Sequence, residues 1–208
     1  MAFCQTSQDT RLRRIPQQNR AIMTVGSILE SAAILFARDG FEKTSTTRIA
    51  ELAGVSVGSL YEYFPNKDSL VASLVKSHCD QMLCHIAQHL ANVKGQGAYR
   101  VIEVFIEATH QSYASHIQLQ RVLLEHIGRV SKPHHYKRVS HSIINLLEAA
   151  LDCSGECLPR ERMRQMLYVI ECVVESLVHR SIVLDQDFFD HDLRDELLVL
   201  TKAYLQQG

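Results

Sequence analysis

The chain contains 11 histidines among its 208 residues, and histidine is a residue type that can bind a metal ion or transfer a proton. His78, Met82, His85 and His89 are spaced by four, three and four residues, so on a helix they share one face. His85 and His89 could hold a metal ion at this spacing. Cys79, although close in sequence, would point away from that face, and no third ligand is fixed by spacing. The pattern therefore favours a polar stripe on a surface or pocket wall, with metal sensing as the alternative.

Enzymatic chemistry has little support in the sequence. Glu107 and His110 form a Glu-x-x-His pair, which a di-metal helical bundle would need twice. No His-Glu-x-x-His motif, nucleophile–base set or phosphate-binding loop stands out. We therefore expect a protein that is not an enzyme and that carries no cofactor and no metal; a di-metal bundle enzyme remains an alternative class.

A more specific signal lies in residues 45–64, STTRIAELAGVSVGSLYEYF. Ser45 and Ser56 are candidate N-caps, because a serine hydroxyl accepts a hydrogen bond from a backbone N–H that the helix leaves without a partner. Gly54 can supply the positive φ of a tight turn. Pro65 prevents the second helix from continuing. Two short helices joined by a glycine turn indicate a helix-turn-helix, although spacing alone also fits a plain helical corner.

The second helix of this motif has an inner and an outer side. Val55 and Leu60 would lock it in place, and Ala50 is small where the two helices cross. The outer side, where a recognition helix meets the major groove of DNA, would then carry five residues. These are Val57, Gly58, Ser59, Tyr61 and Tyr63.

The elements that position these residues are all predicted to be helices. The chain has 9 glycines and 4 prolines, about half the usual share. The sequence shows no sustained alternation of apolar and polar residues, which would indicate strands, and no turn sequence typical of a β-hairpin. Apolar periodicity and breakers predict helices over 21–38, 46–53, 57–64, 67–91, 98–115, 117–130, 134–151, 160–184 and 190–206.

The stretch from residue 21 to residue 81 resembles the TetR family of transcriptional regulators. The residues that carry this resemblance are Leu35-Phe36, Gly40-Phe41, Ile49-Ala50, Ala53-Gly54-Val55-Ser56, Gly58-Ser59-Leu60-Tyr61, Tyr63-Phe64 and Lys67. The resemblance implies an all-α fold with an N-terminal three-helix helix-turn-helix domain and a larger C-terminal helical domain for ligand binding and dimerisation. The expected division is a flexible basic arm (1–20), a DNA-binding domain (21–81) and an effector and dimerisation domain (82–208).

The resemblance also assigns roles on DNA. Tyr61, Tyr63 and Lys67 match positions that usually contact the phosphate backbone, which a phenol or an ammonium can do without reading sequence. Tyr63 could instead be a core aromatic, and Lys67 a solvated cap residue. Thr46 and Thr47 begin the first helix of the motif, where N–H groups and hydroxyls can hold a phosphate.

Base readout has few candidates, because no Arg, Lys, Asn or Gln lies between Ser56 and Tyr63. Arg48 could contact a guanine edge, pair with a phosphate or remain solvated. Val57, Ser59 and Thr47, together with DNA shape, would supply the rest. The leader could enter a minor groove as a basic arm or remain a non-contacting tail; its arginines are Arg11, Arg13, Arg14 and Arg20.

Residues 166–184 are apolar on nearly all sides, so a helix there must be covered on both faces. The resemblance implies that the last two helices pair with their copies in a second subunit, with Val174 and Leu177 in the interface. Burial within a single subunit is the alternative. We therefore expect a homodimer.

The C-terminal half is also expected to hold a small-molecule effector. An organic, mostly hydrophobic ligand is favoured over a metal, because apolar residues are abundant and the metal-ligand spacing is incomplete. The candidate pocket residues are Met82, His85, His89, Phe105, Glu107, His110 and Glu175.

These observations predict a cytoplasmic, ligand-released repressor that binds a near-palindromic double-stranded operator. We expect no membrane association, since no apolar run reaches the ~18 residues of a membrane span and no signal-like leader begins the chain. The six cysteines are expected to be reduced thiols. The alternative is a helical small-molecule or metal carrier without a DNA function.

Overall fold

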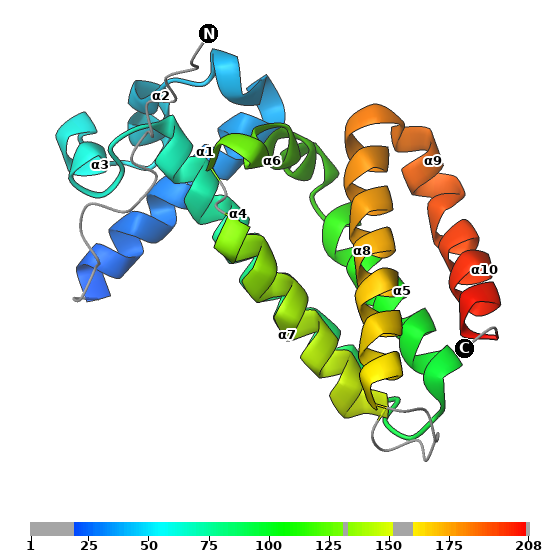
Figure 1. Ribbon diagram of the computed structural model, residues 1–208. Coiled ribbons are helices and arrows are strands. Elements are labelled where there is room, and N and C mark those ends of the chain that lie inside the picture. Colours follow the sequence, from blue (N-terminus) through cyan, green and yellow to red (C-terminus); the bar gives the residue numbers. More distant parts are fainter. Residues whose placement is uncertain (1–18, 131–132, 152–159, 207–208) are drawn as a thin grey trace, which may run out of the picture. The chain divides into compact units, whose positions relative to one another are not determined.

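The computed structural model describes residues 19–130, 133–151 and 160–206, and within these ranges the chain forms helices and no strand (Figure 1). The all-α expectation is therefore confirmed. The helices are α1 (Asn19–Lys43), α2 (Thr46–Leu52), α3 (Val57–Tyr63), α4 (Lys67–Ala91), α5 (Ala98–Ala114), α6 (Ile117–Val130), α7 (Pro133–Leu151), α8 (Arg160–Leu184), α9 (Gln186–His191) and α10 (Leu193–Leu205).

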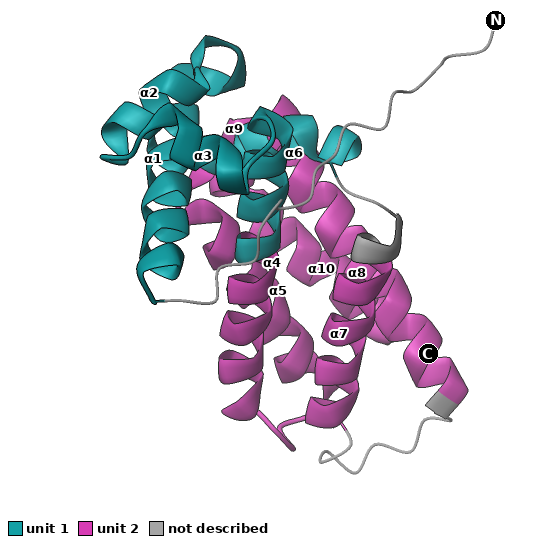
Figure 2. Ribbon diagram, turned by 90° about the vertical axis from the view of Figure 1, so that its left-hand side faces the viewer, with its two compact units in different colours: residues 1–77, 118–131 teal, residues 78–117, 132–208 magenta. Residues whose placement is uncertain are grey.

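The chain divides into two compact units (Figure 2). Unit 1 comprises residues 1–77 and 118–131, and unit 2 comprises residues 78–117 and 132–208. The expected division placed a single boundary after residue 81. In the structure, most of α6 instead clusters with the N-terminal helices, because Leu123 and Val130 are part of their hydrophobic core.

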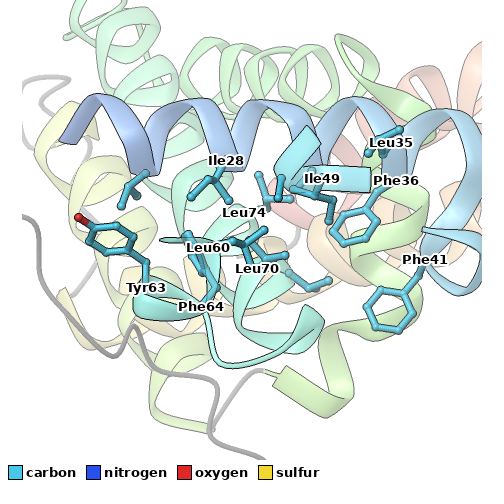
Figure 3. Close-up of a cluster of buried hydrophobic side chains, with 14 of the residues drawn as sticks. Ile28, Leu35, Phe36, Phe41, Ile49, Leu60, Tyr63, Phe64, Leu70 and Leu74 are labelled. Atoms are coloured by element: carbon cyan, nitrogen blue, oxygen red, sulfur yellow. The ribbon is translucent and has the colours of Figure 1, made fainter. Parts of the chain in front are cut away.

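Unit 1 is built around the apolar face of α1 (Figure 3). Ile28 and Phe36 of α1 are completely buried, and so are Ile49 of α2, Leu60 of α3 and Leu70 of α4. Each of these short or long helices therefore contributes at least one anchor to the same core. By this packing, α2 and α3 are held on α1.

Local signals in the sequence mark the helix ends as expected. Gly40 has φ of 78° and breaks α1 before its last turn. Ser45 accepts a hydrogen bond from Arg48 N (3.2 Å), and Ser56 accepts one from Ser59 N (3.0 Å). Asn66 Oδ1 caps α4 by accepting from Ser69 N at 2.8 Å. These caps satisfy backbone donors that each helix start would otherwise leave without a partner.

Helix α1 is long and apolar enough to cross a membrane by length and composition alone, with a mean hydropathy of 1.5 over its most apolar window. The expectation that no segment meets this criterion was therefore wrong. The apolar residues of α1 recur on one face, and Val25, Ile28, Leu35 and Phe36 are buried in unit 1. Packing in this core accounts for part of its apolar composition, while Ile22, Met23 and Ile34 are exposed.

Unit 2 contains α5, α7, α8, α9, α10 and the C-terminal part of α4. Helix α8 packs on α7, α9 and α10, and α5 packs on α7 and α10. The predicted helix over 190–206 corresponds to α10, and the short helix α9 that precedes it was not predicted. The signal that marks the start of α9 is Asp185, whose carboxylate accepts a hydrogen bond from Phe188 N at 3.2 Å.

Gly54 provides a stability test of the turn between α2 and α3. Its φ is +68°, so a Gly54→Ala variant should lose about 1–2 kcal/mol of unfolding free energy through left-handed strain. The matched control is Gly26→Ala, at an exposed position of helix α1 where no neighbouring residue lies within 4 Å of the added Cβ. This variant should gain up to about 1 kcal/mol of unfolding free energy. Urea unfolding measures both, and equal shifts in the two variants would contradict the assignment of strain to Gly54.

Candidate nucleic-acid interface and effector site

The helix-turn-helix in unit 1 has a buried inner side and an accessible outer side. Val55 N donates to Ala50 O (3.0 Å) and closes the turn, while Leu60 is fully buried. The predicted contact residues Thr47, Arg48, Gly58 and Tyr61 are exposed, whereas Thr46, Val57 and Ser59 are half-buried. Seven of the nine predicted DNA-contacting residues thus reach the surface around α2 and α3.

Two hydroxyls meet between α2 and α3. Thr46 Oγ1 and Tyr61 Oη lie 2.9 Å apart and share a hydrogen bond. One of the two hydroxyls donates this bond, so the other keeps its proton for an external acceptor. The pair therefore presents a neutral donor that fits a phosphate oxygen. Ser59 is more constrained, because its hydroxyl lies 2.9 Å from Ser56 Oγ within the N-cap of α3.

Tyr63 does not lie on the outer side of α3. The residue is 8% exposed, and its ring lies in the core of unit 1 together with Leu60 and Phe64 (Figure 3). The outer-side placement was wrong because Tyr63 follows Leu60 by three residues, which puts both on the same helix face. Any contact of Tyr63 with phosphate would have to be made by its hydroxyl alone.

Lys67, at the start of α4, is tied to the end of α1. Its Nζ donates to Phe41 O at 2.7 Å and lies 4.1 Å from the centroid of the Phe41 ring. This geometry differs from a simple solvated cap. An ammonium has three donors, so two remain for a phosphate after the bond to Phe41. Beside it, Arg129 of α6 pairs with the buried Asp68 of α4.

Arg48 is also engaged within unit 1. Its guanidinium contacts Asp39 Oδ2 at 2.6 Å and donates to Lys43 O at 3.2 Å. The hydrogen bond from Arg38 lowers the pKa of Asp39 to about 2, and the one from Arg48 acts in the same direction. Asp39 is therefore ionised at neutral pH. To reach a base edge, Arg48 must exchange this carboxylate for the acceptors of the base.

The predicted basic arm lies almost entirely outside the described residues, and this includes Arg11, Arg13 and Arg14. Arg20 is described and is exposed at the start of α1.

The histidine stripe on α4 is a local arrangement in unit 2. The rings of His85 and His89 lie 4.2 Å apart, and His89 Nδ1 donates to His85 O at 2.9 Å. Met82 is buried. Within the described part of the chain, no group of three or more His, Cys, Asp and Glu is placed to hold a metal ion.

Three other predicted pocket residues on α5 contact the last two helices or the core. Phe105 is buried. His110 Nε2 donates to Phe189 O of α9 at 2.9 Å, and the two rings stack at 4.4 Å. Glu107 lies 3.9 Å from Arg194 of α10. The polar groups of Glu107 and His110 are thus used to hold α9 and α10 against α5.

A groove of about 710 Å³ lies between α7 and α8, which pack side by side in unit 2 (Figure 1). Of the seven predicted pocket residues, Glu175 lines it and the other six do not. The sequence analysis missed four residues that matter in this groove: Ser140, Tyr168, Glu171 and Cys172. The four-residue spacing of Glu171 and Glu175 in an apolar helix was a usable signal.

Glu175 begins a line of polar groups that crosses three helices; the Glu175 side chain is 36% exposed and that of His179 is 20% exposed. His179 Nε2 lies 3.9 Å from Glu175 Oε1 and 2.7 Å from Tyr113 Oη, with which it is hydrogen-bonded. The Tyr113 ring contacts the His78 ring of α4 at 4.7 Å. Burial lowers the pKa of both His78 and His179 to about 4, so both imidazoles are neutral at pH 7.

Two sequence profiles match this chain. Residues 28–74 match "Bacterial regulatory proteins, tetR family", and residues 100–205 match "Tetracyclin repressor-like, C-terminal domain". The first covers the helix-turn-helix and its supporting core. The second covers most of unit 2 and spans half of the chain.

Curated relatives match mainly over part of their length. The transcriptional repressor KstR2 of Rhodococcus jostii is 30% identical over 90 residues, 43% of each chain. The uncharacterised transcriptional regulator YuxN of Bacillus subtilis is 36% identical over 70 residues, 34% of this chain and 23% of the relative. These matches span less than half the length of either relative.

Solved structures share the fold over most of the chain. A TetR-family transcriptional regulator from Streptomyces coelicolor has a TM-score of 0.64 at 20% identity, over 88% of this chain and 98% of that chain. The fatty acid degradation regulator FadR from Bacillus halodurans has a TM-score of 0.63 at 16% identity, over 86% and 93%. The helix-turn-helix, the shared fold and the two profile matches lead to one conclusion: this chain belongs to the TetR family of bacterial regulatory proteins.

Proposed function

We propose that the protein is a DNA-binding transcriptional regulator that acts as a cytoplasmic homodimer and represses its target until a small molecule binds. The observation that carries this proposal is the exposed outer side of α2 and α3, which presents Thr47, Arg48 and Tyr61 from a rigid core. The match of residues 28–74 to the regulator family supports it. Relatives that are named repressors support the direction of control.

On DNA, the contacts divide into two kinds. The Thr46–Tyr61 hydroxyl pair and Lys67 have donors suited to phosphates, which position the protein without reading sequence. Arg48 carries the donors for a bidentate contact with guanine once it leaves Asp39. Val57, Gly58 and Ser59 add a small, weakly polar surface that fits close approach to the groove. Sequence preference then depends on few side chains and on DNA shape.

Dimerisation is proposed through α8 and α10, which carry large exposed apolar side chains. On α8 these include Val169, Leu177 and Leu184, and on α10 they are Val199 and Leu200. Apolar clusters of this kind mark surfaces that a partner covers. Val174, which the sequence placed in the interface, is completely buried within its own subunit, so that placement was wrong. Its side chain faces the core, whereas Leu177, three residues later, is 36% exposed.

Release from DNA requires an effector that binds the DNA-incompetent conformation more tightly than the competent one, since equal affinity would shift no population. Unit 2 offers the α7–α8 groove as a place for such a ligand. The match of residues 100–205 to the repressor C-terminal domain supports an effector role for this half.

The DNA contacts can be separated by salt. A Lys67→Gln variant should bind all DNA sequences more weakly and reduce the slope of log affinity against log salt by about one for each subunit bound, because each subunit loses one phosphate contact. Arg48→Ala should instead lose about 1–3 kcal/mol of discrimination at one base pair in each half-site. Fluorescence anisotropy with the operator and a scrambled duplex measures both quantities, with half-site centres expected ~34 Å apart. Parent-like binding by both variants would exclude these contacts.

The dimer surface can be tested with a charge on α8. Leu177→Glu should dissociate the dimer at micromolar concentration, because burying an unpaired carboxylate costs several kcal/mol. Ile34→Glu is the matched control: Ile34 is an exposed apolar residue on α1, away from α8 and α10 in sequence, and its variant should remain dimeric. Sedimentation velocity distinguishes the two. A parent that sediments as a monomer, or a Leu177→Glu variant that stays dimeric, would contradict the proposed surface.

A further inference from the structure

Glu171 is an unusual residue to find inside unit 2. It is 1% exposed, and its Oε2 accepts hydrogen bonds from Ser140 Oγ at 2.8 Å and from the Cys172 thiol at 3.6 Å. Its Oε1 is buried and has no hydrogen-bond partner among the described residues. A buried acceptor without a donor costs roughly 1–3 kcal/mol, and more when it is charged. Since Glu171 also lines the α7–α8 groove, a ligand in the groove can supply the missing donor.

Glu175 adds a second carboxyl group to the same groove, one helical turn after Glu171. Burial raises its pKa to about 7, and the charge of Glu171 and hydrogen bonding with it act in the same direction. Such a hydrogen bond exists only while Glu175 keeps a proton. A positive charge bound beside the two carboxyl groups would favour the ionised form of Glu175.

The protein supplies no compensating cation at this point among the residues that the structure describes. His179, 3.9 Å from Glu175, is neutral at pH 7 because burial lowers its pKa to about 4. Arg164 lines the groove but pairs with Glu148 at 2.8 Å. Lys137 also lines the groove and is exposed, without an ion pair to either carboxylate. The two carboxyl groups are thus left for an external partner.

The rest of the groove suits an apolar body. Ile144 of α7 and the ring of Tyr168 of α8 are among its lining residues. Its volume of about 710 Å³ lies within the range typical of small-molecule sites. A ligand that matches both parts carries a positively charged, hydrogen-bond-donating head and an apolar body.

We propose that the α7–α8 groove binds an organic cation of this kind, an amine or amidine, with its head between Glu171 and Glu175 and its body against Ile144 and Tyr168. As the effector of a regulator, this ligand rests on the function proposed above. That the groove binds an organic cation is argued from its geometry alone and does not depend on the proposed function.

The line of contacts from Glu175 gives such a ligand a route to α4. A bound cation keeps Glu175 ionised beside His179, which is hydrogen-bonded to Tyr113 of α5, and Tyr113 contacts His78 of α4. Helix α4 also provides Lys67 and the Asn66-capped start in unit 1. A change in charge in the groove therefore reaches the helix that contains a proposed phosphate contact.

The test uses the full-length protein at pH 7.5 and three probes of one shape: octylamine, octanol and octanoate. Octylamine is positively charged at this pH, like a lysine side chain. Isothermal titration calorimetry should give octylamine a Kd at least tenfold lower than that of octanol, with octanoate the weakest of the three. Equal affinities for the three probes, or no binding of octylamine, would overturn the proposal.

Charge-removing variants locate the site. Glu171→Gln and Glu175→Gln keep the side-chain shape, and each should weaken octylamine at least tenfold while leaving octanol within about threefold. Glu161→Gln is the matched control, because Glu161 lines the same groove but is exposed. It should weaken octylamine less than threefold. Octylamine binding that survives both the Glu171→Gln and the Glu175→Gln substitution, in variants whose thermal unfolding shows them folded, would place the cation elsewhere and refute the proposal.

A parallel DNA-binding assay separates this inference from the proposed function. If octylamine binds through Glu171 and Glu175 and also weakens operator binding, the cation site and its role as the effector site are both supported. If it binds through them and operator affinity is unchanged, the cation site holds and its role as effector site fails. If the protein binds its operator but octylamine does not bind, the cation site fails and the regulator proposal stands.

Discussion

Two seven-residue helices cannot persist by themselves in water, and that limit governs unit 1. Nucleation costs make helices shorter than ~12 residues marginal, so α2 and α3 exist because tertiary packing holds them. The holding contacts are few: Ile49 and Ala50 for α2, and Leu60 with Tyr63 for α3, all buried against α1 and α4. The polar outer side of the motif therefore depends on the hydrophobic core of unit 1.

Three of the candidate DNA-contacting residues also make hydrogen bonds within the protein. Lys67 bonds to the carbonyl of Phe41, Arg48 bonds to Asp39, and Thr46 bonds to Tyr61. Each contact restricts a flexible or rotatable group before any ligand arrives. A side chain that is already ordered loses less conformational entropy on binding, which offsets part of the cost of breaking or sharing its internal bond.

The positions of several helix ends could be predicted from the sequence, because they are set by single residues that act on the adjacent backbone. Ser45, Ser56 and Asn66 cap helices through their own side chains, and Gly54 adopts a positive φ that other residues avoid. Tyr63 and Val174 were misplaced because facing depends on the tertiary contacts of a helix, which residue type does not specify. Phe105 and His110 share a helix with a plausible pocket pattern, but α9 and α10 cover them, and the separate helix α9 was not foreseen. The carboxyl pair at Glu171 and Glu175 was only half recognised, since the burial of Glu171 depends on contacts such as the one with Ser140 of the neighbouring helix α7.

The ion pair between Arg48 and Asp39 has an electrostatic consequence for selectivity. Because Asp39 stays ionised far below neutral pH, acidification within the physiological range does not release Arg48. When Arg48 turns to DNA, the Asp39 carboxylate keeps only Arg38 as a partner, and its repulsion with the polyanion opposes the new contact. Only a duplex that offers Arg48 two well-placed acceptors offsets both losses. Asp39 thus competes with DNA for Arg48. This competition lowers the affinity for every DNA sequence by the same amount, and only a sequence with matching acceptors for Arg48 compensates for it.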